Sequence, residues 1–384
     1  MTEFFLHSFN TLSHGLIGYV IPFLFVLTIV VFFHELGHFL IARWAGVKVL
    51  TFSLGFGPEL AGFNDRHGTR WKISAIPLGG YVKFFGDDSE ASTPSTETLE
   101  KMSAEERAGS FHHKKVGPRA AIVAAGPIAN FLLAIVIFTC LFTFFGKPST
   151  TARVDKIEAN SAAAAAGFQV GDVVTSIDGK QIGSFSDMQR IVGVRAGEQL
   201  NFVVKRGDGT TVQLKGTPEL REVKDAFGNM HRLGVLGITR ATAPGDVVTE
   251  RVDPGTALWL GVKETWFVVE RTFAYIGGVF SGREAADQVG GPLRIAQISG
   301  QVATIGLAAL IHLAAVLSIS IGLLNLFPVP LLDGGHLLFY AVEAVRGRPL
   351  SERAQEMGFR IGLALVLMLM VFATYNDILH LAAS

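Results

Sequence analysis

The stretch VVFFHELGHFLIARW, residues 30–44, places two histidines and a glutamate inside an otherwise apolar run. On a helix, His34 and His38 project from one face a turn apart, which suits two imidazole nitrogens that bind one tetrahedral Zn²⁺ ion. Glu35 stands beside them, where the glutamate of an H-E-x-x-H site acts as a base and not as a ligand. Ionisable residues are costly within a membrane span and usually have a function there. The alternative is that the histidines only form hydrogen bonds between helices.

The composition predicts a membrane protein with a soluble part. Of the 384 residues 49% are hydrophobic and only 17% are charged, and the mean hydropathy is +0.40. A spanning helix needs about 20 mostly apolar residues, and four segments meet this requirement: residues 16–44, 120–145, 302–327 and 359–379. The net charge of zero gives no indication of nucleic acid as a partner, and the single cysteine excludes an intramolecular disulfide.

The positions of Lys and Arg predict on which side of the membrane each loop lies, because cytoplasmic loops are enriched in these residues. They gather in three places, after the first span, before the second, and between the third and fourth. We therefore expect both termini and residues 146–300 on the outer side of the membrane, which is the periplasm if the source is a Gram-negative bacterium, and the metal site near the cytoplasmic side. His112 and His113 lie in one of these basic flanks, where a solvated flank and a second metal site are the two interpretations.

The resulting organisation is a polytopic α-helical membrane protein of four transmembrane helices, with a membrane-associated β-hairpin and a periplasmic α+β domain. The expected segments are the outward N-terminal tail and first span (1–44), a cytoplasmic loop with the hairpin (45–119), the second span (120–145), the periplasmic domain (146–240), a linker with an amphipathic helix (241–301), the third span (302–333), a cytoplasmic loop (334–355), and the fourth span with the tail (356–384).

The end of the third span, LLNLFPVPLLDGGH at residues 323–336, contains the candidate third ligand. Pro328 and Pro330 cannot continue a regular helix, so the chain must break or extend there and can direct Asp333 back among the helices. Asp333 and the two histidines all lie near the cytoplasmic ends of their spans. The histidine pair and the aspartate are therefore expected at the same depth in the membrane. His336 is a rival third ligand, although its position beyond two glycines points toward the surface.

Three motifs in this order resemble the site-2 protease family of intramembrane zinc metalloproteases, in particular its bacterial RseP type with one PDZ domain. They are HELGH in the first span, AGPIAN at residues 125–130 in the second, and NLFPVPLLDGGH at the end of the third, so the resemblance covers nearly the whole chain. It implies one zinc ion per chain, with Glu35 as the catalytic base. The implied roles of the other residues are zinc ligands for His34, His38 and Asp333, substrate binding for Asn325, and close packing of the second span for Gly126, Pro127 and Asn130.

Residues 49–60 and 69–86 read as the two strands of a β-hairpin. Their apolar residues and glycines suit strands that dip into the membrane beside the metal, where an unwound substrate could add a strand. The alternative is a hairpin that only caps the helices on the cytoplasmic side. The resemblance implies substrate binding by the GFG loop, and the substrate-binding set that we predict comprises Asn325, Gly55, Phe56, Gly57, Pro328 and Pro330. The polar segment 87–110 predicts a mobile linker.

Residues 151–220 resemble a bacterial PDZ domain, with GDVVTSIDG at residues 171–179 as the main signal, and RLGVLGI at 232–238 as a further strand of a permuted module. Such a domain serves as a peptide dock or as a size filter. Residues 258–280 predict an amphipathic helix that either lies in the outer membrane interface as part of a substrate gate or packs against the domain and the ends of the spans.

We therefore expect an intramembrane zinc endopeptidase whose partners are membrane lipid and single-pass transmembrane substrates. The resemblance implies anti-sigma factors and remnant signal peptides, cleaved in regulated intramembrane proteolysis after a first cut by another protease. The main alternative is a metal-binding membrane scaffold or chaperone that acts through its PDZ domain, but a structural metal site has no need of Glu35. A transporter with a metal site at the bilayer midplane would be favoured by inverted repeats, and we find none.

Overall fold

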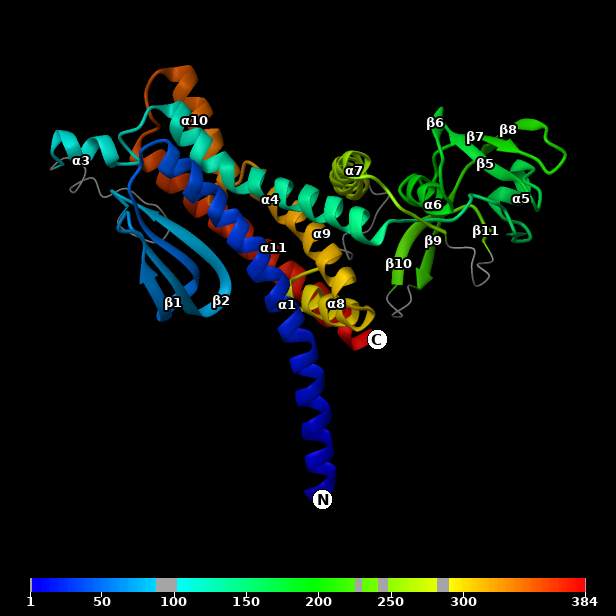
Figure 1. Cartoon of the computed structure of the whole chain (residues 1–384), viewed down its shortest axis with the longest axis horizontal. Helices are drawn as coiled ribbons and strands as arrows, with labels where there is room; N and C mark the ends of the chain where they lie inside the picture. The colour runs from blue at the N-terminus through cyan, green and yellow to red at the C-terminus, as the bar shows by residue number, and fades with distance from the viewer. Residues whose placement is uncertain (1, 88–101, 225–229, 241–247, 282–289, 384) are drawn as a thin grey trace. The chain divides into compact units, whose positions relative to one another are not determined.

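In the computed structural model (Figure 1), the described residues are 2–87, 102–224, 230–240, 248–281 and 290–383. The chain divides into two compact units. Unit 1 consists of Met1–Phe138, Gly261–Val269 and Val289–Ala382, and unit 2 consists of Thr139–Leu260, Glu270–Gln288 and Ala383–Ser384.

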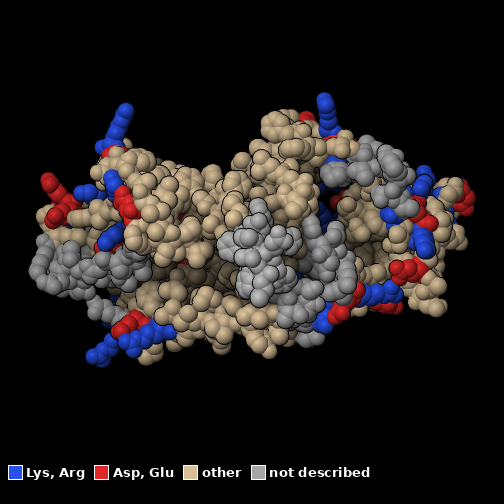
Figure 2. All heavy atoms as spheres, turned by 90° about the horizontal axis from the view of Figure 1, so that it is seen from below, with Lys and Arg blue, Asp and Glu red and all other residues tan. Residues whose placement is uncertain are grey.

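Among the described residues, four helices are long and apolar enough to cross a membrane, as the sequence predicts. They are α1 (Thr2–Trp44), α4 (Val116–Phe145), α9 (Leu307–Leu326) and α11 (Glu352–Ala383), and their apolar parts cover Ile17–Trp44, Val116–Phe145, Leu307–Leu326 and Arg353–Leu379. On the face drawn in Figure 2, the Lys, Arg, Asp and Glu side chains of the described residues leave a broad uncharged stretch of surface. Such a surface is what helices in contact with hydrocarbon need.

The predicted start of the third span is wrong. Residues 302–305 belong to a separate helix, α8 (Pro292–Ile305), which is followed by α9 from Leu307 onward. Gly306 separates the two helices with a φ of 133°, a conformation that residues with a side chain rarely adopt. The apolar sequence continues across this glycine, so a span predicted from hydropathy alone begins about one helical turn before α9.

Two further helices occupy segments that the sequence predicts as loops. The loop predicted for residues 334–355 contains α10 (Asp333–Arg346), which ends at Gly347 in a left-handed conformation. The predicted linker 87–110 contains α3 (Ala104–Gly109), whose N-terminal Ser103 and Glu106 form a reciprocal capping box. Residues 88–101 of that linker lie outside the described residues.

The predicted hairpin is confirmed as β1 (Val49–Asn64) and β2 (Arg70–Phe84), paired antiparallel. One half pairs from Val49↔Phe84 to Leu54↔Gly80, and the other from Glu59↔Ser74 to Asn64↔Arg70. The bend between them falls at Gly55 and Gly57, whose φ values of 86° and 84° favour glycine. The hairpin packs on α1 through aromatic rings: Phe52 stacks on Trp71 with a centroid distance of 4.2 Å, and both rings contact Phe39 edge-on.

Unit 2 contains the α+β domain expected after the second span. Its four-stranded sheet has the order β6-β5-β7-β8, formed by β5 (Val173–Ile177), β6 (Lys180–Gln181), β7 (Leu200–Lys205) and β8 (Thr211–Gly216). The helices are α5 (Ala162–Ala166) and α6 (Phe185–Gly193), and the remaining strands pair as β3 (Lys147–Ser149) with β12 (Val248–Glu250), β4 (Lys156–Ile157) with β11 (Ile238–Thr239), and β9 (Glu219–Lys224) with β10 (Met230–Val235). Residues 232–238, which the sequence predicts as one further strand, therefore include the end of β10 and the first residue of β11.

The domain core explains why these residues form this sheet. Alternate positions of β7 point inward, where Leu200, Phe202 and Val204 are almost completely buried.

The predicted amphipathic helix is present as α7 (Pro254–Phe280), which Asp253 caps by accepting hydrogen bonds from the main chain of Gly255 and Thr256.

Candidate metal centre

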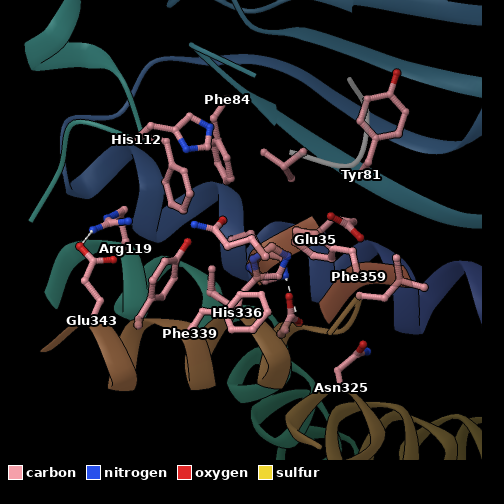
Figure 3. Close-up of a pocket in the computed structure, with 18 of the residues that line it drawn as sticks. Glu35, Tyr81, Phe84, His112, Arg119, Asn325, His336, Phe339, Glu343 and Phe359 are labelled. Carbon is pink, nitrogen blue, oxygen red and sulfur yellow. Dashed lines mark hydrogen bonds and ion pairs between the residues drawn. The ribbon is translucent and has the colours of Figure 1, made fainter. Parts of the chain in front are cut away.

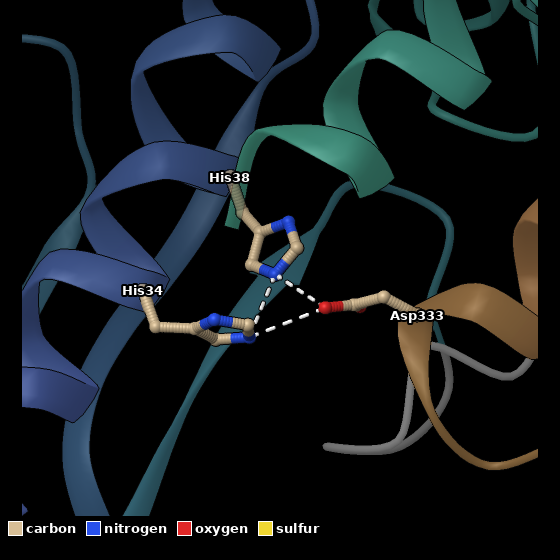
Figure 4. Close-up of side chains that lie close together, drawn as sticks. All are labelled: His34, His38 and Asp333. Atoms are coloured by element: carbon tan, nitrogen blue, oxygen red, sulfur yellow. Dashed lines mark hydrogen bonds and ion pairs between the residues drawn. The ribbon is translucent and has the colours of Figure 1, made fainter. Parts of the chain in front are cut away.

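Two histidines of α1 and an aspartate of α10 lie close together (Figure 4). The Oδ2 atom of Asp333 lies 3.2 Å from Nε2 of His34 and 3.5 Å from Nε2 of His38. The two Nε2 atoms are 3.3 Å apart. Among the described residues, these three form the one group of His, Cys, Asp and Glu side chains arranged to hold a metal ion.

The donor set fits a zinc ion. Nδ1 of His38 lies 2.9 Å from the main-chain carbonyl oxygen of Ile122, which can only accept, so Nδ1 carries the proton and donates. In the neutral ring Nε2 then carries a lone pair directed at Asp333. A carboxylate and an imidazole lone pair at this distance repel each other unless a cation lies between them. Two imidazole nitrogens, one carboxylate oxygen and an open position are typical of catalytic zinc.

Helix α4 contributes no ligand but lies directly against the two rings. A Cβ atom added at Gly37 of α1 would overlap the carbonyl oxygen of Ala125, so the two helices approach each other closely there. Gly126 faces the two histidine rings themselves, because a Cβ at this position would overlap Nε2 of His38 and lie 2.9 Å from Cε1 of His34. Only glycine leaves room for the rings at this crossing.

The chain break predicted from the prolines positions Asp333. Helix α9 ends at Leu326, Phe327 is extended, and Leu331 has a φ of 117°, a costly value for a residue with a side chain. The turn into α10 is compact, since a Cβ at either of the two glycines after Asp333 would overlap main-chain carbonyls of this segment. The break thus places Asp333 in the first turn of α10, facing α1.

A cavity of about 370 Å³ extends from the metal-binding group (Figure 3). Glu35 and Asn325 line it together with the three candidate ligands, and both labelled side chains point into the drawn pocket. Residues of β2, among them Gly80 and Tyr81, form another part of its wall. The structure therefore brings the predicted base and the predicted substrate-binding asparagine to the same pocket as the ligands.

The far part of the cavity is polar and was not predicted from the sequence. Arg119 donates to Glu343 at 2.5 Å and lies over the ring of Tyr340, and burial raises the pKa of that phenol to about 12. His112 lies 2.7 Å from the carboxylate of Asp87, so the interpretation of His112 as a solvated flank is wrong. The signal in the sequence was weak, because these residues come from separate segments that only the fold unites.

His336, the rival ligand, lines the cavity without joining the metal-binding group. It lies one turn beyond Asp333 on α10, and its ring packs against Phe359 with a centroid distance of 5.4 Å. Burial lowers the pKa of its imidazole, so the ring is neutral at pH 7. The expectation that it points toward the surface was wrong, because α11 covers it.

Five predicted substrate-binding residues do not line the cavity. Phe56 stacks on the lining residue Tyr81 at a centroid distance of 6.0 Å, and Gly55 and Gly57 flank it in the bend of β1. Pro328 and Pro330 lie in the chain break, where Pro330 packs against α11: a Cβ at Gly362 would overlap its carbonyl oxygen.

The residues predicted for close packing, Pro127 and Asn130, are buried in α4 beside α9. A Cβ at Gly322 of α9 would lie 3.2 Å from the carbonyl oxygen of Pro127.

Comparison with known proteins shows which protein family this sequence matches. The sequence profile described as Peptidase family M50 matches residues 22–369. A protein of Agrobacterium fabrum named as a candidate zinc metalloprotease is 53% identical over 94% of this chain and 96% of its own length. The Metalloprotease MmpA of Caulobacter vibrioides is 41% identical over 95% of this chain and 96% of its own length.

One solved structure is also similar to part of the chain. The PDZ domain of an SdrC-like protein from Listeria monocytogenes is 21% identical and covers 24% of this chain and 87% of that domain, with a TM-score of 0.18. This score is too low to assign a fold.

Proposed function

This chain belongs to peptidase family M50, and we propose that it is an intramembrane zinc endopeptidase that cleaves a membrane-spanning segment of a single-pass protein. The observation that carries this proposal is the arrangement of His34, His38 and Asp333 around one point, with Glu35 in the same cavity. The two histidines lie on a helix long and apolar enough to span a membrane. A protease with its site on such a helix acts on substrates that reach the membrane interior.

His34, His38 and Asp333 are the residues that would hold the zinc ion, and Glu35 the residue that moves the proton. A zinc ion held by these residues would supply Lewis-acid chemistry: it would polarise the scissile carbonyl and lower the pKa of a water molecule to about 7. The carboxylate of Glu35 takes the proton from the attacking water and passes it to the leaving amine. Asn325 enters the cavity from α9 and holds the substrate main chain through its amide.

The strand of β2 that lines the cavity provides a way to present the substrate. Residues 80–84 pair with β1 on one side and contribute Gly80, Tyr81 and Val82 to the cavity wall. Gly80 lies against Glu35, since a Cβ there would be 3.0 Å from the Glu35 Cγ atom. A transmembrane helix has all its amides satisfied internally, so it must unwind locally, and an unwound segment can then pair with this strand.

The outer side chains of the hairpin support its contact with lipid. Five large apolar residues of β1 and β2 are about half exposed or more: Leu60 (70%), Phe63 (62%), Leu78 (57%), Ile73 (54%) and Ile76 (49%). So many exposed apolar side chains on one small sheet would be a liability in water, but they suit a hairpin that dips into the membrane. A hairpin that only caps the helices would not need them.

Unit 2 acts as a PDZ-like peptide dock or size filter, so that another protease must first shorten the outer part of the substrate. In this proposal the protein lies in a bacterial inner membrane with both termini and unit 2 in the periplasm. The Lys and Arg residues of the loops support this orientation. Anti-sigma factors and remnant signal peptides are the substrate classes, and regulated intramembrane proteolysis is the process.

The experiment that tests this function compares wild type with Glu35→Gln and Asp333→Asn, purified in detergent, for bound zinc and for cleavage of a shortened single-pass substrate. We expect Glu35→Gln to keep its zinc and to lose cleavage by a factor of about 10² to 10⁴, the usual contribution of a general base. We expect Asp333→Asn to lose zinc. Cleavage by Glu35→Gln at the wild-type rate would refute the protease and would favour a metal-binding scaffold.

A further inference from the structure

Asn130 of α4 is completely buried beside the candidate ligand His34. Its Nδ2 atom is placed 3.3 Å from Nδ1 of His34. Its Oδ1 atom is buried and has no hydrogen-bond partner among the described residues. A buried amide oxygen without a donor costs about 1–3 kcal/mol, so the arrangement leaves one strong acceptor unused next to an imidazole ring.

The chemistry of the ring decides which amide atom must face it. For His34 to offer its Nε2 lone pair to a metal, the neutral ring must carry its proton on Nδ1. An Nδ1–H group facing an NH₂ group would set one donor against another. Half a turn about the Cβ–Cγ bond of Asn130 exchanges the two amide atoms without changing the shape of the side chain, and brings Oδ1 to the Nδ1–H group.

We propose that Asn130 is a positioning residue of the metal centre, whose Oδ1 accepts a hydrogen bond from Nδ1–H of His34 and so fixes the tautomer and the orientation of that ligand. His38 is held in the same manner, because its Nδ1 donates to the carbonyl oxygen of Ile122. Ile122 and Asn130 are two i,i+4 steps apart on α4, with Gly126 between them. One face of α4 therefore supplies an acceptor to each histidine ligand.

A role in packing alone does not account for an asparagine at this position. Asn130 contacts α9 through its main chain and its Cβ atom, not through its amide. Ser318 donates to the Asn130 carbonyl oxygen at 2.9 Å, and a Cβ at Gly322 would lie 3.1 Å from the Asn130 Cβ atom. An apolar residue of the same size would preserve both contacts without burying an amide. Among the described residues, the imidazole of His34 is the one group within hydrogen-bond distance of this amide.

The inference rests on the metal centre proposed above, and its test reads metal affinity instead of activity. Zinc dissociation constants are measured by chelator competition on the full-length protein in detergent, together with the absorption spectrum of the Co²⁺-substituted protein. The variants are Asn130→Asp, which keeps an acceptor in the same shape, Asn130→Leu and Asn130→Ala, which remove it, and Ser318→Ala as the control for packing around the same residue.

We expect Asn130→Leu and Asn130→Ala to bind zinc about 10- to 100-fold more weakly, as is typical when the hydrogen-bond partner of a ligand is lost. Asn130→Asp should bind zinc at least as tightly as wild type with an unchanged Co²⁺ spectrum, and Ser318→Ala should stay within about twofold. Rescue by aspartate is the result that a packing role does not produce.

Two outcomes would overturn the inference. If Asn130→Leu or Asn130→Ala binds zinc as tightly as wild type, the amide does not position His34. If Asn130→Asp binds more weakly than both, the amide acts as a donor to the ring. Failure of the wild-type protein to bind zinc at all would instead refute the metal centre itself, so the two failures are distinguishable.

Discussion

Replacement of Gly126 by alanine tests whether α4 sets the geometry of the metal centre. An ideal Cβ at this position would lie 2.5 Å from Cε1 of His38 and 2.9 Å from Cε1 of His34, and would overlap Nε2 of His38. Ordinary van der Waals contact begins at 3.4 Å. The Cε1 atom of His38 must therefore move at least about 0.9 Å farther from the new Cβ, through a movement of either the helices or the rings. Both movements disturb the site, because the His38 ring is tied to Ile122 on the same helix.

The magnitude follows from this displacement. Overpacking of a close contact costs about 1–3 kcal/mol, and alanine returns about 1 kcal/mol through its higher helix propensity. The folded protein should therefore persist, while a ligand displacement of nearly 1 Å costs about 100-fold in catalysis. We expect zinc affinity to fall at least tenfold and kcat/KM for a shortened single-pass substrate to fall about 100-fold or more.

Gly117→Ala is the matched control, since it lies on the same helix and a Cβ there meets nothing within 4 Å. Zinc affinity is measured by chelator competition and thermal unfolding by calorimetry for both variants. Gly117→Ala should keep its zinc and its activity. Wild-type zinc affinity in Gly126→Ala would show that the rings have free space toward α4, and would refute the argument that this helix constrains them.

Three further predictions concern the surroundings of the site. Gly362→Ala should weaken zinc binding and leave Glu35 in place, because a Cβ there would overlap the carbonyl oxygen of Pro330 and push the segment that carries Asp333; unchanged zinc affinity would contradict it. Asp377→Asn should lower the free energy of unfolding by about 1 kcal/mol without loss of zinc, because the buried carboxylate accepts from the main chain of Gly291 at 2.8 Å and caps α8; thermal unfolding and metal content measure both effects. Treatment with a strong chelator should abolish cleavage and added Zn²⁺ should restore it; cleavage that survives complete removal of metal would exclude the zinc mechanism.

The sequence predicted the parts of the site that depend on local spacing. His34 and His38 are one helical turn apart, so any helix brings them together, and the prolines before Asp333 require a break that reaches back toward α1. The polar end of the cavity could not be predicted in this way, because Asp87, His112 and Glu343 come from three segments with no common period. The boundary at Gly306 was missed for a related reason, since hydropathy reports apolar length and not the continuity of a helix.

The motif AGPIAN contributes no candidate metal ligand, yet its Gly126 and Asn130, together with the preceding Ile122, contact the two histidines from one helix. His34 and His38 are spaced by four residues on α1, and Ile122, Gly126 and Asn130 are spaced by four residues on α4. Ile122 and Gly126 meet His38, while Gly126 and Asn130 meet His34, so the two helices run antiparallel with these residues in register. A slip of one residue along α4 would turn this face about 100° away and present a side chain where only Gly126 leaves room. The spacing of these three residues therefore matches the spacing of the two histidines, which is how α4 would hold both candidate ligands without binding metal itself.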